Sequence, residues 1–208
     1  KICWHNLMAN PSLDFWICFL SSWKKIYTKR KKSLKWFIVL IPTYILLNSF
    51  ITSDLNSSLH FVLDGSKVLI RPWTLLTSIF LHGNLAHLML NGFALALFGS
   101  ILENIIGSKR FLFLFFISGI FANIPGAIFY NSSLGASGAI FGIMGCLTIL
   151  RPKMTIWMNL MPVPMWLAAI IWALQDIFGI FVPSDIGYWA HLGGLFFGLI
   201  YGFYVKNR

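Results

Sequence analysis

Six stretches of apolar residues, each bounded by charged residues or turn formers, dominate this sequence. They lie at Trp36–Ser53, Asn84–Glu103, Lys109–Phe129, Ser137–Leu150, Val163–Ile180 and Tyr188–Val205. A helix needs about 20 mainly apolar residues to cross the roughly 30 Å hydrocarbon core of a bilayer. Hydrophobic residues make up 58% of the chain and charged residues 11%, against roughly 45–50% and about 25% in a soluble domain. The sequence therefore predicts an all-α membrane protein with six transmembrane helices.

Lys and Arg residues lie in alternate connections between these segments, which predicts the orientation of the segments in the membrane. A basic run precedes the first segment, and further pairs follow the second, fourth and sixth: Lys24 to Lys35, Lys109/Arg110, Arg151/Lys153 and Lys206/Arg208. Short loops rich in Lys and Arg stay on the cytoplasmic side. We expect a multi-pass protein of the plasma membrane with both termini in the cytoplasm. The net charge of +10 is thereby explained by topology, and no nucleic-acid partner is expected.

The predicted organisation has two parts. Residues 1–34 contain an apolar stretch too short to span, followed at once by the basic run. This pattern is typical of a segment lying on the cytoplasmic leaflet, whose anionic lipids attract it. Residues 35–206 form the six-helix core.

The fourth segment, Ser137–Leu150, is too short to cross the whole membrane. At 1.5 Å per residue a helix of this length reaches only about 21 Å. Its first residue should therefore lie inside the membrane. Non-helical backbone at such a depth must be buried in protein or line a water-filled cavity, which suits the polar stretch 130–133 that leads to Ser137.

Four polar residues in the predicted spans should lie at a similar depth below the outer surface. His87 and Asn91 are one helical turn apart in the second span, Ser137 opens the fourth, and His191 is about one turn into the sixth. Polar groups inside a membrane are costly and usually face a cavity or a partner. These four are the candidate site residues.

Glycine spacing predicts that the fourth and sixth spans pack closely. Gly138 and Gly142 repeat at four residues on one, and Gly194 and Gly198 on the other, a spacing that lets helix backbones approach. Ser137 and His191 stand at the matching ends of these stripes. If the stripes pack, the hydroxyl and the imidazole come within hydrogen-bond reach, the geometry of an activated serine nucleophile.

Three motifs resemble those of the rhomboid family of intramembrane serine proteases. They are Gly135-Ala136-Ser137-Gly138, the run from His82 to Asn91, and Ala190-His191-Leu192-Gly193-Gly194. The resemblance implies a six-helix bundle with a Ser137–His191 dyad, no aspartate and no cofactor or metal. It assigns the oxyanion hole to the Ser137 amide and the side chains of His87 and Asn91, and it implies transmembrane-helix substrates.

Two acids and one aromatic residue bear on this resemblance. Asp176 and Glu103 lie in the spans, but the sequence suggests no route from either to His191. Rhomboids often have Tyr where this chain has Phe141, so the ring could support His191 without a phenolic hydrogen bond.

Two other functions remain open. An inactive rhomboid-like protein would recognise membrane segments without cutting them, although Ser137 and His191 are both present. A transporter or metal-binding protein could use His82, His87 and His191, since imidazole binds zinc and copper. No Cys, Asp or Glu accompanies these histidines at a ligand spacing, and His-Glu-x-x-His is absent. The sequence indicates no oligomeric state.

Overall fold

The computed structural model describes residues 60–158 and 161–208, which are mostly helical. The second predicted span is a continuous helical segment made of α5, a π-helical stretch and α6; the other helices follow singly. Their bounds are Leu85–Ala94 (α5), Leu95–Gly99 (π), Ser100–Ile106 (α6), Ser108–Phe129 (α7), Ser137–Leu150 (α8), Met165–Gly179 (α9) and Tyr188–Lys206 (α10). The predicted first span and the segment 1–34 lie outside the described residues.

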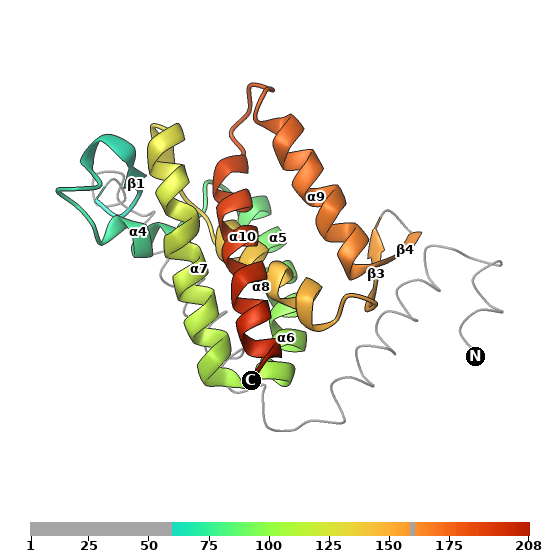
Figure 1. Cartoon of the computed structure of the whole chain (residues 1–208). Helices are drawn as coiled ribbons and strands as arrows, with labels where there is room; N and C mark the ends of the chain where they lie inside the picture. Colours follow the sequence, from blue (N-terminus) through green and yellow to red (C-terminus); the bar gives the residue numbers. More distant parts are fainter. Residues whose placement is uncertain (1–59, 159–160) are drawn as a thin grey trace.

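Helix α10 occupies the middle of the bundle, with α7 and α9 on either side and α8 packed against it (Figure 1). Its most extensive contacts are with α8, followed by α7. The α9–α10 turn lies at one end of the bundle, and the α6–α7 turn and the C-terminus lie at the other (Figure 1).

Glycines bring the backbones of α8 and α10 into direct contact. A Cβ atom added at Gly194 would overlap the carbonyl oxygen of Gly138, and one at Gly198 would overlap that of Gly142. Each partner lies 56 positions further along the chain, so the two helices run in the same direction. The close packing predicted from the glycine spacing is confirmed.

Helix α7 closes the other side of α8 and ties it to the segment before α5. Ser118 Oγ donates to the carbonyl oxygen of Ala139 on α8 at 3.3 Å. Asn123 Nδ2 donates to the carbonyl oxygen of Leu75 at 2.7 Å, within the short helix α4 (Thr74–Thr77). These bonds satisfy buried polar groups and fix the start of the described chain against the bundle.

Within the described residues, two short antiparallel strand pairs accompany the helices. β1 (Leu63–Asp64) pairs with β2 (Ser132–Ser133), which anchors the stretch that leads to α8. β3 (Thr155–Met158) pairs with β4 (Met161–Pro164). The fifth span was predicted to begin at Val163, but that residue is extended and α9 begins at Met165. Proline disfavours helical backbone in the residue before it, and Pro164 imposes this on Val163.

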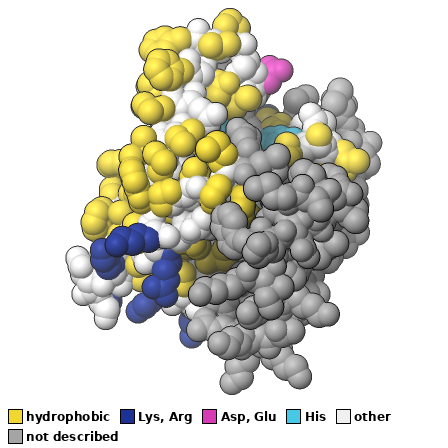
Figure 2. All heavy atoms as spheres, turned by 90° about the vertical axis from the view of Figure 1, so that its right-hand side faces the viewer, with side chains coloured by type: hydrophobic (Ala, Val, Ile, Leu, Met, Phe, Trp, Pro, Cys, Tyr) yellow, Lys and Arg dark blue, Asp and Glu magenta, His cyan; other side chains and the backbone are white. Residues whose placement is uncertain are grey.

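The described surface carries many large apolar side chains. Figure 2 shows them over much of the described part of the visible face, with Lys and Arg side chains gathered near one end. Examples that are at least half exposed lie on four helices: Met89, Phe113, Phe178 and Phe196. By length and composition, Leu85–Ile106 and Ser108–Phe129 could each cross a membrane. A surface of this kind suits contact with lipid rather than water.

Candidate active site

Ser137 and His191 meet where α8 and α10 begin. His191 Nε2 lies 2.9 Å from Ser137 Oγ, within hydrogen-bond distance. Ser137 is the first residue of α8 and His191 the fourth of α10. The glycine contacts below them hold the two helices at this spacing. The pair has the geometry of a serine nucleophile beside a base.

Aromatic rings fix the plane of the His191 imidazole. Phe141, one turn after Ser137 on α8, stacks on it with ring centroids 4.3 Å apart and an interplanar angle of 7°. Tyr188 stands edge-on to the imidazole at 6.4 Å. Phe141 therefore supports the histidine through its ring alone.

Asp176 also contacts His191, contrary to the expectation from sequence that neither acid reaches it. Asp176 Oδ1 lies 3.2 Å from His191 Nδ1, and the two side chains are only 7% and 12% exposed. Asp176 lies three residues before the end of α9, and His191 three residues after the start of α10. Because the two helices are antiparallel neighbours, residues at equal distances from their shared turn lie at the same height along the helix axes. The prediction for Asp176 was wrong.

Glu103 does not contact the site. Its carboxylate Oε1 accepts a 2.6 Å hydrogen bond from Ser108 Oγ at the α6–α7 turn. That turn lies at the end of the bundle opposite the α9–α10 turn (Figure 1).

His87 and Asn91 face the stretch immediately before Ser137. Gly135 has a φ of +120°, and a Cβ there would lie 2.9 Å from His87 Nε2 and 4.0 Å from Asn91 Nδ2. Only glycine suits this backbone conformation and this close approach. Asn91 is buried and donates through Nδ2 to the carbonyl oxygen of His87 at 3.0 Å. Both side chains thus border the loop that positions Ser137.

His82, the first residue of the motif that runs to Asn91, belongs to the same surroundings. Its Nε2 accepts a 3.4 Å hydrogen bond from the backbone amide of Ala136, and its ring lies 4.8 Å from that of His87. The amide of Gly135 donates to the carbonyl oxygen of Ser78 at 2.9 Å. The backbone before Ser137 is therefore held from two sides. In the sequence, the one signal for the contact between His82 and Ala136 was that His82 belongs to the same motif as His87.

Within residues 60–158 and 161–208, no three His, Cys, Asp or Glu side chains gather into a group that could hold a metal ion. The three histidines considered from sequence do not form one. Cys146 is a buried free thiol in α8. Cys3 and Cys18 lie outside the described residues.

Comparison with known proteins gives the family. Residues 70–208, more than half of the chain, match the Rhomboid domain. The chain is similar to Rhomboid protein 1, mitochondrial, of Saccharomyces cerevisiae, with 32% identity covering 64% of this chain and 42% of that protein. It is also similar to two Bacillus subtilis proteins. Rhomboid protease GluP is 38% identical over 61% of this chain and 24% of its own length. Putative rhomboid protease YdcA is 34% identical over 65% and 68%.

The chain spans less than half the length of the yeast relative and of GluP. The match nevertheless includes every helix of the bundle from α4 to α10. It agrees with a mostly helical structure whose apolar helices form a membrane fold. The chain belongs to the rhomboid family.

Proposed function

We propose that this protein is an intramembrane serine endopeptidase that cleaves transmembrane helices of other membrane proteins. The observation that carries the proposal is the 2.9 Å contact between His191 Nε2 and Ser137 Oγ. Membership of the rhomboid family supports it, as do the names of two relatives that are called a protease or a putative protease. Ser137 is the nucleophile and His191 the general base.

The reaction follows from the two atoms in contact. His191 Nε2 accepts the Ser137 proton as Oγ attacks the scissile carbonyl carbon, and then donates that proton to the leaving amine. A water molecule, activated by the same nitrogen, hydrolyses the acyl-enzyme and restores the serine. No cofactor takes part in this scheme.

The developing oxyanion needs donors on the Ser137 side of the cavity. The first amides of a helix have no partner within the helix, so the Ser137 N–H at the start of α8 is available. His87 and Asn91 border the same loop and supply side-chain donors. Donors fixed in advance within a partly desolvated site stabilise this charge more strongly than water does.

We place the six-helix core at residues 35–206, with residues 1–34 on the cytoplasmic leaflet. Helix α8 has 14 residues, so its first turn lies below the outer membrane surface and a water-filled cavity leads to Ser137. Both termini are cytoplasmic in the plasma membrane. In support, the α6–α7 turn, which Lys109 and Arg110 follow, and the C-terminus lie at the end of the bundle away from the α9–α10 turn (Figure 1).

Substrates are transmembrane helices cut near the outer surface. An intact helix engages its carbonyl groups in internal hydrogen bonds, so the segment to be cut must unwind before attack. Helices with small or helix-destabilising residues near that surface unwind at the lowest cost in free energy.

A fluorophosphonate probe and a labelled transmembrane substrate test the proposal together. The wild-type protein should be labelled and should cleave, whereas Ser137→Ala should do neither. Ser132→Ala is the matched control, because this exposed serine lies in β2, close in sequence but outside the contact with His191. Folded wild-type protein that binds the substrate without labelling or cleavage would instead show an inactive rhomboid-like binding protein.

A further inference from the structure

We propose that Asp176 is a positioning residue that fixes the proton of His191 on Nδ1 and so directs the Nε2 lone pair of His191 at Ser137. This inference rests on the proposed function. Its basis is the 3.2 Å contact between Asp176 Oδ1 and His191 Nδ1.

The two nitrogens of His191 have chemically different partners. A neutral imidazole carries one proton, and its other nitrogen accepts. A carboxylate only accepts, so Asp176 holds the proton on Nδ1 and leaves the Nε2 lone pair directed at Ser137 Oγ, 2.9 Å away. When His191 takes the serine proton, the same carboxylate stabilises the positive charge.

The surroundings of Asp176 favour this role over that of a simple tie between helices. Its Oδ2 atom is buried and has no hydrogen-bond partner among the residues that the structure describes. The carboxylate therefore directs its hydrogen bonding at His191. A buried acid in an apolar helix is costly and is typical of a functional group.

Helix packing sets the alignment of the two residues. Gly179 at the end of α9 lies against the ring of Tyr188, and a Cβ there would overlap that ring. Tyr188 opens α10 one turn before His191, while Asp176 lies one turn before Gly179. This close approach places the carboxylate level with the imidazole.

Asp176→Asn keeps the shape and removes the charge. Loss of a charge-assisted hydrogen bond should lower kcat roughly 10- to 100-fold. If the new amide donates to Nδ1 and holds the wrong tautomer, the loss should approach the roughly 10⁴-fold effect of the same change in serine proteases of the triad type. KM and the thermal midpoint should stay close to wild type. Gln175→Asn is the matched control, because the adjacent side chain is exposed.

The ¹⁵N NMR chemical shifts of the histidine ring report which nitrogen carries the proton, and this measurement does not depend on turnover. In the wild type, His191 should carry its proton on Nδ1, and Asp176→Asn should change the His191 signals while Gln175→Asn leaves them unchanged. A lower thermal midpoint with unchanged kcat and unchanged ring shifts would show a helix tie and overturn the inference. Absence of Ser137-dependent labelling in the wild type would refute the proposed function instead, and the ring shifts would still decide the role of Asp176.

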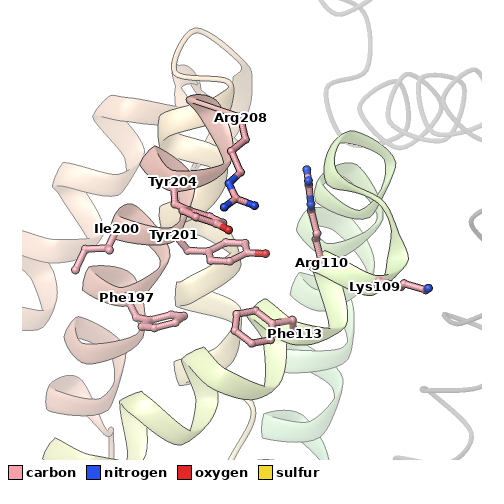
Figure 3. Close-up of a pocket in the computed structure, with 8 residues that line it drawn as sticks. All are labelled: Lys109, Arg110, Phe113, Phe197, Ile200, Tyr201, Tyr204 and Arg208. Carbon is pink, nitrogen blue, oxygen red and sulfur yellow. The ribbon is translucent and has the colours of Figure 1, made fainter.

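We infer, from a different part of the molecule, that a cleft between α7 and α10 binds an anionic phospholipid. The cleft has a volume of about 570 Å³ and lies at the end of the bundle near the C-terminus (Figure 3). Its lining combines cationic, phenolic and apolar side chains: Lys109, Arg110, Phe113, Phe197, Ile200, Tyr201, Tyr204 and Arg208.

The cleft separates charge from apolar surface. Arg110 and Arg208 point toward the gap between the helices, while Phe113 and Phe197 lie on the side away from them (Figure 3). The guanidinium of Arg208 lies 4.6 Å from the centroid of the Tyr204 ring. Neither arginine forms a salt bridge with a carboxylate in the described part of the chain. A phosphate group bound by the two arginines would neutralise their positive charge.

The apolar side of the cleft favours a lipid over a free anion. Phe113 and Ile200 are each 51% exposed and provide a surface for an acyl chain. The orientation rule requires only that Lys and Arg residues lie in cytoplasmic loops, and it does not require them to line a cavity. Here two arginines, two phenol groups and an apolar floor line one cavity, which matches a lipid with an anionic headgroup.

Native mass spectrometry of the detergent-solubilised protein tests this site with phosphatidylglycerol and phosphatidylcholine. The wild type should retain phosphatidylglycerol preferentially, and the double variant Arg110→Gln/Arg208→Gln should weaken it roughly 10- to 30-fold, given about 1 kcal/mol for each basic residue. The control Arg151→Gln/Lys153→Gln removes the same charge at exposed positions outside the cleft. Equal loss in the control, no preference for phosphatidylglycerol, or full displacement by glycerol phosphate would each overturn the inference.

Discussion

The contact between α8 and α10 gives a quantitative prediction for Gly194→Ala. The new Cβ would overlap the carbonyl oxygen of Gly138 and lie 2.8 Å from its carbonyl carbon. Carbon and carbonyl oxygen pack at roughly 3.3–3.6 Å, so the backbones must separate by more than about 1 Å. The 2.9 Å contact between Ser137 Oγ and His191 Nε2 would then open beyond hydrogen-bond distance. A displacement of this size costs roughly 10²-fold in rate, and overpacking costs about 1–3 kcal/mol in stability.

Gly92→Ala is the control for this experiment. Gly92 is in α5, and an added Cβ there would meet nothing within 4 Å. Alanine favours a helix over glycine by roughly 0.5–1 kcal/mol, so this variant should be as stable as wild type or more so. Thermal unfolding and substrate cleavage, measured in one detergent, compare the two variants. Wild-type turnover and midpoint in Gly194→Ala would refute the claim that backbone contact sets the Ser137–His191 distance.

Three further predictions concern the oxyanion hole, the topology and the first loop. Asn91→Ala should lower turnover roughly 10²–10³-fold while Ser137 still reacts with the probe; wild-type turnover would make Asn91 a packing residue. A reporter fused after Arg208 should lie in the cytoplasm and one inserted near Ser184 outside, and an external signal at Arg208 would contradict the span assignment. Hydrogen bonds from Lys67 and, to a smaller extent, Ser66 lower the pKa of Asp64 to about 2. Any stability from Asp64 should therefore persist above about pH 4 and disappear as the pH falls towards 2, and pH titrations of unfolding should lose this step in Asp64→Asn.

The positions of the helices in the described residues could be predicted closely from the sequence because lipid imposes a simple rule. Each apolar segment had to end near a charge or a turn former, and α8 has the bounds Ser137–Leu150 that this rule gives. The π-helical stretch Leu95–Gly99 and the strand pairs were not predicted. The hydrophobic pattern of a lipid-exposed segment does not distinguish a local change in helix winding, and strands of two to four residues are too short to show a periodicity.

The approach of Ser137 to His191 could be inferred from glycine spacing, because glycines mark where two backbones can touch. The contact of Asp176 with His191 could not be inferred in the same way. Its level relative to His191 follows from their equal distances to the α9–α10 turn, but sequence alone does not show toward which neighbour the carboxylate turns. The same limit applied to His82, whose bond to the Ala136 amide joins residues 54 positions apart.

The division of the reactive pair between α8 and α10 also has a consequence for biosynthesis. A nascent chain that has inserted α8 already contains Ser137, but His191 and the glycine face that packs on Gly138 belong to a helix not yet made. Asp176 on α9 likewise has no His191 imidazole to contact at that stage. Under the proposed function, the growing polypeptide should therefore pass through the insertion machinery, among many other unfolded hydrophobic segments, as a chemically inert protein, and it should acquire peptidase chemistry only once α10 has packed.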